Sequence, residues 1–190
     1  MTLNRKPIIK ITMGDAVGTG PEIIVKALSC ALGGSNANPV CGVTPMSEPV
    51  IRAVEQRDLP AIYKIERETF KDAFPPFFID FLVEENPETF LVAEETGEVV
   101  GYVVASVEKK VGHLVSLAVR RDRLRRAVGS SLVLKILEIL KRSGVSSVRL
   151  EVRKSNVAAQ NFYNKLGFSF VRVYRGYYGD EDAYVLEKKL

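Results

Sequence analysis

Several kinds of residue are scarce in this 190-residue chain, and each scarcity excludes a class of protein. The chain has two cysteines, Cys30 and Cys41, which form no C-x-x-C pair, and a single histidine, His113. This set of ligands argues against a zinc site, and so few cysteines are typical of a reducing compartment such as the cytoplasm. No apolar run reaches the roughly 18 residues that a membrane-spanning helix requires. We therefore expect no metal and no membrane segment.

Positive and negative charges nearly balance along the chain. The 27 Lys and Arg residues against 23 Asp and Glu residues give a formal net charge of +4. A balance this modest does not indicate specific nucleic-acid binding. The basic residues do cluster, however, with five arginines among residues 119–126. At 46% hydrophobic and 26% charged residues, the composition predicts one globular domain with a small appendage.

The character of the sequence changes near residue 46. Residues 30–48 are rich in Gly, Ser, Asn and Pro without helical or strand periodicity, which predicts a linker. Residues 7–28 resemble the first strand, glycine loop and helix of 4-hydroxythreonine-4-phosphate dehydrogenase, but the remainder of that enzyme does not follow. We interpret residues 1–29 as a vestigial strand-loop-helix fragment without that activity, and residues 49–190 as the functional domain.

From residue 50 onward, strand and helix patterns alternate in a clear order. A strand, two helices and an antiparallel meander of three strands come first, followed by an amphipathic helix, a strand, a helix and two strands. Asp58 is expected to cap the first helix, and Gly144 to end the third. The expected elements are strands 50–54, 90–94, 99–107, 112–119, 146–152, 168–174 and 182–186, and helices 59–70, 77–85, 129–142 and 156–165.

The segment after the strand that ends at Val119 is a candidate anion site. This strand, its loop and the helix from Gly129 form a β-loop-α unit, whose helix N-terminus offers unpaired N–H groups and a partial positive charge. The five arginines add positive charge, while Ala127 and Gly129 leave room for a phosphate to approach the backbone. The alternative interpretation is a solvated arginine-rich loop.

Three sequence blocks in the second half carry a family resemblance. They are GHLVSLAV at 112–119, LEVRKSN at 150–156 with the helix that follows it, and YYGDEDA at 177–183. With these blocks in this order, residues 50–190 resemble the GNAT acyl-CoA N-acyltransferase superfamily, and within it the protein N-terminal acetyltransferases of the RimI type and the NatA catalytic subunit. The resemblance implies an α/β fold with a mixed central sheet flanked by helices. It also implies acetyl transfer from acetyl-CoA to the N-terminal α-amino group of proteins or peptides, ribosomal and nascent chains included, by direct attack in a ternary complex.

The resemblance places acetyl-CoA between the strands at 112–119 and 146–152, with its pyrophosphate on the loop before the third helix. The family pattern Arg/Gln-x-x-Gly-x-Gly/Ala reads Leu-Arg-Arg-Ala-Val-Gly here, so Leu124 and Ala127 depart from it. We expect weaker cofactor binding, or compensation by Arg123, Arg125 and Arg126, and strain at Ala127 if the loop requires a positive φ there. The implied cofactor-binding residues are Leu117, Ala118, Val119, Arg123, Leu124, Arg125, Arg126, Ala127, Val128, Gly129, Ser130, Asn156 and Tyr163.

An N-terminal amine with a pKa near ~8 must lose a proton before it can attack a thioester, so a general base is useful. Strand alternation puts Glu151 on the face opposite the apolar residues at 148, 150 and 152, and the resemblance makes Glu151 the base. The alternative is a surface carboxylate paired with a neighbouring arginine. His113 lies near the start of the central strand, and we expect a structural role for it.

The thiolate of CoA gains from a proton donor when it leaves, and the resemblance assigns that role to Tyr163. Helical spacing puts Tyr163 on one face with Asn156 and Ala159. Asn156 is then a cofactor contact. The alternative is a core tyrosine whose hydroxyl is satisfied within the protein.

Aromatic residues in two segments are candidates for contacts with the acceptor peptide. Phe70, Phe74 and Pro75 are expected to form walls for its first side chain, and Tyr177 and Tyr178 to hydrogen-bond its backbone. The NatA-type Leu-Pro-Glu-Asn-Tyr segment is replaced here by Asp-Ala-Phe-Pro-Pro, which argues against a NatA-like preference for small first residues. Core packing of the aromatics is the alternative. Two other functions stay open: a GNAT enzyme for lysine side chains or small amines, and a catalytically weak acyl-CoA binding module.

Overall fold

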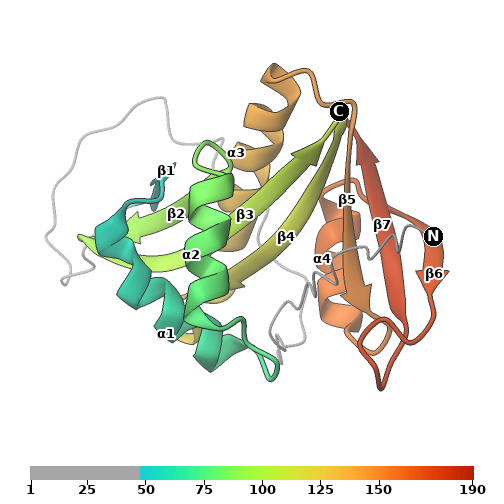
Figure 1. Ribbon diagram of the computed structural model, residues 1–190, viewed down its shortest axis with the longest axis horizontal. Helices are drawn as coiled ribbons and strands as arrows, with labels where there is room; N and C mark the ends of the chain where they lie inside the picture. Colours follow the sequence, from blue (N-terminus) through green and yellow to red (C-terminus); the bar gives the residue numbers. More distant parts are fainter. Residues whose placement is uncertain (1–47) are drawn as a thin grey trace, which may run out of the picture.

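A seven-stranded sheet with the order β1-β2-β3-β4-β5-β7-β6 organises the fold (Figure 1). The computed structural model describes residues 48–190. β4 and β5 run parallel, whereas the other neighbouring strands are antiparallel, so the sheet is mixed as expected. The strands are β1 (Val50–Ala53), β2 (Phe90–Glu95), β3 (Glu98–Glu108), β4 (Val111–Val119), β5 (Ser147–Arg153), β6 (Ser169–Tyr174) and β7 (Ala183–Lys189).

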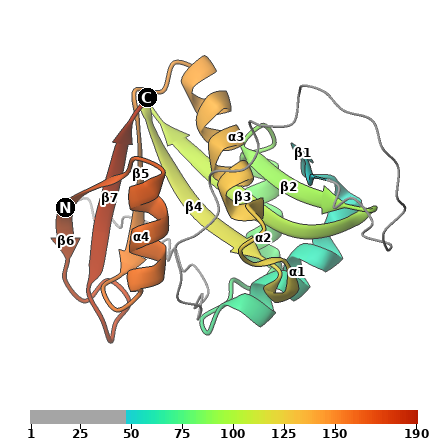
Figure 2. The same cartoon turned by 180° about the vertical axis from the view of Figure 1, so that it is seen from behind.

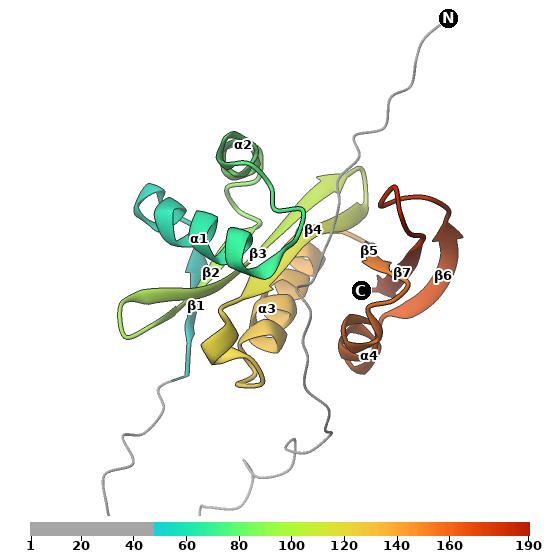
Figure 3. The ribbon, with the colours of Figure 1, turned by 90° about the horizontal axis from the view of Figure 1, so that it is seen from below.

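Four helices cover the two faces of the sheet. α1 (Leu59–Thr69) and α2 (Pro76–Glu85) lie on one face, and α3 (Val128–Arg142) and α4 (Val157–Lys165) lie on the other (Figures 2 and 3). Two single 3-10 turns, η1 (Gln56–Asp58) and η2 (Arg121–Arg123), precede α1 and α3. Among residues 48–190, no helix combines the length and apolar character needed to cross a membrane.

The central strands are apolar on both sides because helices cover both sides. In β2, Leu91 and Ala93 pack toward the α3 and α4 layer, whereas Phe90 and Val92 pack toward α1 and α2. The stripe predicted for the third helix is confirmed, since its apolar positions are buried against the sheet. The residues of α3 with no exposed surface are Leu132, Val133, Ile136 and Leu140.

Every element expected after residue 48 is present, and the differences lie at the ends. α3 begins at Val128 rather than residue 129, and α4 begins at Val157 because Asn156 is its N-cap. The last strand, β7, continues to Lys189 because it pairs with β5 along its whole length. The expected fragment at residues 1–29 and nearly all of the expected linker lie outside the described residues.

The expectation that the side chain of Asp58 caps α1 is wrong. Asp58 stands at the N-cap position, but its carboxylate accepts no hydrogen bond from the first turn of α1. It instead accepts two hydrogen bonds from Arg52, of 2.7 and 2.8 Å, and one from the N–H of Glu55. The carboxylate of Asp58 therefore binds Arg52 of β1 in place of the N–H groups of the first turn of α1.

Candidate active site

β4 and β5 are paired only at their beginnings and then diverge (Figure 1). Their parallel register runs from Val111 opposite Ser147 to His113 opposite Arg149. Within the described residues, no strand lies between the later parts of β4 and β5. Backbone N–H and C=O groups on these facing edges are strong hydrogen-bonding groups that need partners. A ligand that enters between the strands can pair with them, which is the position expected for acetyl-CoA.

The side chains of Glu151 and His113 meet just beyond this point of divergence. Oε2 of Glu151 lies 2.6 Å from Nε2 of His113, and Glu151 is 4% exposed. The predicted alternation of β5 is confirmed, because Leu150 and Val152 belong to the core cluster on the α3 and α4 side. A surface carboxylate paired with an arginine is the wrong interpretation, since Glu151 is buried and this close partner is a histidine.

The direction of the hydrogen bond between these two side chains depends on the tautomer of His113. When the carboxylate is ionised it can only accept, so in that state Nε2 of His113 carries the hydrogen and Nδ1 of the neutral ring keeps a lone pair. The pair therefore offers two positions that can accept a proton, the carboxylate of Glu151 and Nδ1 of His113. His113 was expected to be structural, and its contact with Glu151 adds it to the candidate catalytic residues.

Tyr163 lies on α4 with a buried hydroxyl. The residue is 1% exposed, and its Oη has no hydrogen-bond partner among the described residues. The rings of Phe162 and Phe168 pack edge-on against it. The interpretation as a core tyrosine is thus half right, because the ring is in the core but residues 48–190 offer its hydroxyl no partner. Burial raises the pKa of Tyr163, so the hydroxyl keeps its proton at neutral pH.

Asn156 caps the helix that carries Tyr163. Its Oδ1 accepts a 3.0 Å hydrogen bond from the N–H of Ala159, and the residue is 8% exposed. Asparagine at an N-cap satisfies one of the first-turn N–H groups that a helix leaves unpaired. The expected cofactor contact at Asn156 therefore stays a prediction, beside a capping role that the structure shows.

The arginine-rich loop is divided between paired and exposed residues. Arg120 binds Glu98 and Asp122, and Arg123 binds Asp122 and Glu95 with contacts of 2.6 and 2.8 Å. These ion pairs fasten the loop to the β2–β3 turn. The neighbouring residues Leu124, Arg125, Arg126 and Ala127 are exposed. Of the arginines expected to compensate for Leu124, Arg123 is therefore already engaged, and Arg125 and Arg126 lie open to solvent.

The backbone before α3 is left-handed at two residues that are not glycine. Arg125 and Ala127 both have a φ of 61°. The condition for strain at Ala127 is met, and this conformation costs a residue with a Cβ roughly 1–2 kcal/mol. Ala127 is also the N-cap of α3 and provides no side-chain oxygen for the first turn. The N–H groups of Val128, Gly129 and Ser130 thus lack a side-chain cap and can bind an anion.

The other expected cofactor residues on β4 lie on both sides of the sheet. Leu117 and Ala118 are each 2% exposed, in the α3 and the α1 layers of the core respectively. Val119 is half-buried. Their side chains are committed to packing, so their contacts with a cofactor would be made by the backbone edge of β4.

The three residues at the α1–α2 segment that were predicted to contact the peptide differ in how exposed they are. Phe70 is 6% exposed and packs in the core under α1, so the core-packing alternative applies to it. Phe74 is half-buried, with its ring centroid 4.8 Å from that of Phe78. Pro75 is exposed at the start of α2. Phe74 and Pro75 thus remain available as walls for a peptide side chain.

The two tyrosines of the β6–β7 segment lie beside Glu151. Tyr178 is 3% exposed, and its hydroxyl donates a 3.4 Å hydrogen bond to the backbone carbonyl of Glu151. The ring of Tyr177 packs edge-on against that of Tyr178, with centroids 5.0 Å apart. Burial raises the pKa of both tyrosines, so both hydroxyls are protonated near neutral pH. The structure therefore brings the predicted peptide-binding tyrosines to the candidate base.

A buried polar network that sequence analysis missed supports the α1–α2 segment. Glu66, 2% exposed, accepts hydrogen bonds from the N–H of Phe74 at 2.8 Å and from the hydroxyl of Tyr102. The same hydroxyl lies 3.1 Å from Oγ of Ser116 on β4. The available signal was a charged residue directly after Ile65 on the buried face of a predicted helix, where a lone carboxylate needs partners.

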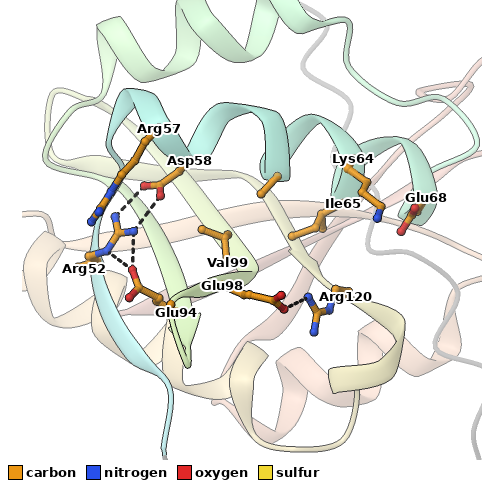
Figure 4. A pocket seen from close by; sticks show the side chains of 12 residues that line it. Arg52, Arg57, Asp58, Lys64, Ile65, Glu68, Glu94, Glu98, Val99 and Arg120 are labelled. Carbon is orange, nitrogen blue, oxygen red and sulfur yellow. Dashed lines mark hydrogen bonds and ion pairs between the residues drawn. The ribbon is translucent and has the colours of Figure 1, made fainter.

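A separate pocket of about 410 Å³ lies between α1 and the β2–β3 turn (Figure 4). Charged side chains line it, but most are already paired with one another. Arg52 binds Asp58 and Glu94, and Arg120 binds Glu98. This pocket is an ion-paired hollow, and it contains neither Glu151 nor Tyr163.

The mixed sheet, the divergence of β4 and β5 and the loop before α3 define a class of protein. Residues 57–168 match the acetyltransferase (GNAT) family, and the match spans more than half of the chain. The chain therefore belongs to the acetyltransferase (GNAT) family. The fold and the enzyme class expected from the sequence are confirmed.

Three curated relatives illustrate the likeness. An uncharacterized N-acetyltransferase of Methanocaldococcus jannaschii is 38% identical, with 74% of this chain and 91% of the relative aligned. An N-alpha-acetyltransferase of Sulfurisphaera tokodaii is 37% identical, over 74% of this chain and 92% of the relative. An Escherichia coli enzyme, the alanine N-acetyltransferase of ribosomal protein bS18, is 33% identical over 72% of this chain and 94% of its own.

Solved structures share the same fold. Ard1 from Thermoplasma volcanium superposes with a TM-score of 0.73 at 31% identity, covering 76% of this chain and 99% of its own. The NatB acetyltransferase complex bound to CoA gives a TM-score of 0.67 at 26% identity, over 74% of this chain and 99% of that one. The resemblance to N-terminal acetyltransferases stated from the sequence is thereby confirmed.

Proposed function

We propose that this chain transfers the acetyl group of acetyl-CoA to the α-amino group of protein N-termini. The observation that carries the proposal is the contact between the buried Glu151 and the half-buried His113 at the divergence of β4 and β5. A proton acceptor stands there between two diverging strand edges, beside Tyr178 and on the sheet that also carries the α1–α2 segment. The curated relatives that are N-alpha-acetyltransferases support the choice of an N-terminal amine.

The residues before α3 fit a cofactor that carries phosphates. The left-handed backbone at Arg125 and Ala127 and the uncapped first turn of α3 present N–H groups, and Arg125 and Arg126 add exposed positive charge. Oriented N–H groups at a helix N-terminus, combined with arginines, are a general solution for binding phosphate. Acetyl-CoA supplies the activated acetyl thioester. The backbone edge of β4 at 117–119 would hold the part of the cofactor that lies between the strands.

The pair of Glu151 and His113 acts on the acceptor amine. An α-amino group with a pKa of about 8 is largely protonated at neutral pH and cannot attack until it loses a proton. We assign acceptance of this proton to the pair, directly or through one water molecule. The bond formed joins the amine nitrogen to the acetyl carbon, and the bond broken joins that carbon to sulfur. General-base assistance of this kind contributes about 10²–10⁴-fold.

Tyr163 acts on the leaving group. Its raised pKa keeps the hydroxyl protonated, and the lack of a partner within the described residues leaves that proton available for donation to the departing sulfur. A buried hydroxyl without a partner costs about 1–3 kcal/mol, which a bound acceptor would recover. Orientation comes from α4, whose first turn is fixed by the Asn156 cap.

The acceptor lies on the face of the sheet that carries α1 and α2. Phe74 and Pro75 from one segment and Tyr177 and Tyr178 from another are the groups that would contact its first residues. We include N-termini of ribosomal proteins and nascent chains among the acceptors. This inclusion is supported by the relative named for ribosomal protein bS18.

Two matched peptides test the proposed function. Both have the same sequence with one internal lysine, and one has a free N-terminus whereas the other is already acetylated there. We expect the wild-type enzyme with acetyl-CoA to modify the first peptide at its α-amino group and to leave the second unmodified, as read by mass spectrometry. Equal rates on the lysine of the blocked peptide, or on a polyamine, would contradict the proposal.

A further inference from the structure

Arg153 is the last residue of β5 and follows Glu151 by two positions. Because side chains alternate along a strand, both side chains leave the same face of the sheet. The side chain of Arg153 is 16% exposed, so most of it lies within the protein. The strand that carries the candidate base thus places a half-buried guanidinium two residues further along, at the end of the strand.

The guanidinium of Arg153 contacts carboxylates from two distant segments. Nη2 lies 3.0 Å from Oδ2 of Asp72, in the α1–α2 segment. Nη1 lies 3.1 Å from Oδ1 of Asp180 and 3.4 Å from Oε2 of Glu181, both in the β6–β7 segment. The planar group also stacks over the ring of Tyr178, 4.2 Å from its centroid. One side chain therefore joins three parts of the chain.

The two joined segments are those expected to contact the acceptor. Asp72 stands two residues before Phe74, and Asp180 stands two residues after Tyr178. Without Arg153, the carboxylates of Asp72, Asp180 and Glu181 would lose the cation that all three contact, and Lys71 would be left to act on Asp180 alone. Like charges repel, so the two segments would be held together less tightly.

Further contacts bind the β6–β7 segment to the end of β5. Glu181 accepts hydrogen bonds from the backbone N–H and the hydroxyl of Ser155. The N–H of Lys154 donates to the carbonyl of Asp182. The hydrogen bond from Arg153 holds the pKa of Asp180 below its ordinary value, so this carboxylate is ionised near neutral pH. The β6–β7 segment is thus fixed on β5, and the contact with Asp72 extends the connection to the α1–α2 segment.

We propose that Arg153 is a positioning residue that holds the α1–α2 segment and the β6–β7 segment at a fixed separation, so that an acceptor peptide lies between them with its amine at Glu151. This proposal rests on the proposed function. The guanidinium suits the task because its planar fork can bind carboxylates on two sides while it stacks on an aromatic ring. An ammonium group, which is a point charge on a flexible stem, cannot make all of these contacts at once.

Steady-state kinetics of Arg153→Gln and Arg153→Lys, with a free-N-terminus peptide, test the proposal. We expect the KM for peptide to rise about tenfold in both variants, equivalent to about 1.4 kcal/mol. We expect kcat and the Kd for acetyl-CoA to change far less, because Glu151, Tyr163 and the loop before α3 are untouched. Arg172→Gln is the matched control. The substitution removes the same charge from an arginine that also stacks on a tyrosine, Tyr174 of β6, but that has no contact with Asp72.

Asp72→Asn is a second variant that tests the same proposal if an Arg153 variant does not fold. Asp72 is exposed, so its substitution is expected to leave the fold intact. It should raise the peptide KM in the wild-type background and have no further effect in Arg153→Gln, because coupled residues are not additive. Salt should raise the wild-type peptide KM, because exposed ion pairs are screened. The same salt series should leave the KM of Arg153→Gln flat.

Amide hydrogen exchange separates a failure of this proposal from a failure of the proposed function. In Arg153→Gln, exchange at residues 70–76 and 176–182 should increase together, whatever reaction the enzyme catalyses. An unchanged peptide KM, together with exchange that rises in one segment alone or in neither, would overturn the positioning role. A wild-type enzyme without activity on free N-termini would instead overturn the proposed function, before any variant is compared.

Discussion

The backbone N–H of Phe74 donates a 2.8 Å hydrogen bond to the buried carboxylate of Glu66. The hydroxyl of Tyr102 donates to the same carboxylate, so one α1 side chain fastens the α1–α2 segment to β3. Burial raises the pKa of Glu66 above its ordinary value of 4.5, and the two hydrogen bonds offset only part of that effect. The segment expected to meet the peptide is therefore anchored by a group whose charge is costly to bury.

Two substitutions of Glu66 should distinguish the contribution of its hydrogen bonds to stability from the contribution of its charge. In Glu66→Gln the amide oxygen can accept from Phe74 while the amide N–H donates to Tyr102, whose own hydrogen turns toward Ser116. We expect Glu66→Ala to lower the free energy of unfolding by about 1–3 kcal/mol near pH 7, and Glu66→Gln to retain most of it. Urea denaturation of the variants measures both values.

The pH dependence of the same variants checks the direction of the pKa shift. A carboxyl group with a raised folded-state pKa binds its proton more tightly in the folded than in the unfolded protein. Wild-type stability should therefore fall as pH rises from about 4.5 through the raised pKa, relative to Glu66→Gln. Parallel stability curves for the two proteins over this window would show that Glu66 is not perturbed.

Tyr163→Phe should slow catalysis without a loss of stability. The substitution removes the proposed proton donor, and it also removes a buried hydroxyl that has no partner in the described part of the chain. We expect kcat to fall while the free energy of unfolding stays equal or rises. Tyr102→Phe is the opposite case, because its hydroxyl bonds Glu66 and Ser116, and it should lose about 1–3 kcal/mol. An unchanged kcat in Tyr163→Phe would return Tyr163 to a packing role.

Ala127→Gly should improve the loop before α3. Glycine adopts a φ of 61° without the clash that a Cβ introduces, so we expect a gain of roughly 0.5–1 kcal/mol in stability and tighter acetyl-CoA binding. Ala61→Gly in α1 is the control, and it should lose about as much because its backbone is helical. Thermal denaturation and calorimetric titration give the two readouts. A loss of stability at both positions would contradict the strain assigned to Ala127.

The arginines of the loop should differ in their effect on cofactor affinity. Arg126 is exposed, whereas Arg123 is held by Glu95 and Asp122. We expect Arg126→Ala to weaken acetyl-CoA binding by about 1 kcal/mol, and Arg123→Ala to weaken it less. Calorimetric titration at two salt concentrations measures both. Equal affinities for wild type and Arg126→Ala would place the phosphates elsewhere.

Local sequence patterns predicted the elements, because their periodicity is set within each segment. The face of Glu151 followed from strand alternation, and the stripe of α3 from helical spacing. The contact between Glu151 and His113 did not, since it depends on how β4 and β5, 38 residues apart at these positions, align in parallel. Ion pairs such as Arg123 with Glu95 are long-range for the same reason.

The sequence also did not predict backbone dihedral angles or contacts that join several separate segments. The sequence showed alanine where the family pattern has glycine, but whether the loop requires a positive φ there could be learned only from the fold. Asp58 is a second example. It stands at the N-cap position of α1, but its carboxylate hydrogen-bonds Arg52 of β1, a contact that the local sequence does not specify. The role of Arg153 requires three separate segments to meet, and no local pattern specifies that.

Glu151→Gln tests the central claim most directly, because the substitution keeps the shape of the side chain and removes its ability to accept a proton. The assay is kcat for acetylation of a free-N-terminus peptide between about pH 6 and pH 9, with Glu138→Gln on the surface of α3 as control. General-base loss predicts a kcat at least about tenfold lower near pH 7, with acetyl-CoA affinity unchanged. Wild-type turnover across the whole pH range would contradict the assignment of Glu151 and His113 as the proton-accepting pair.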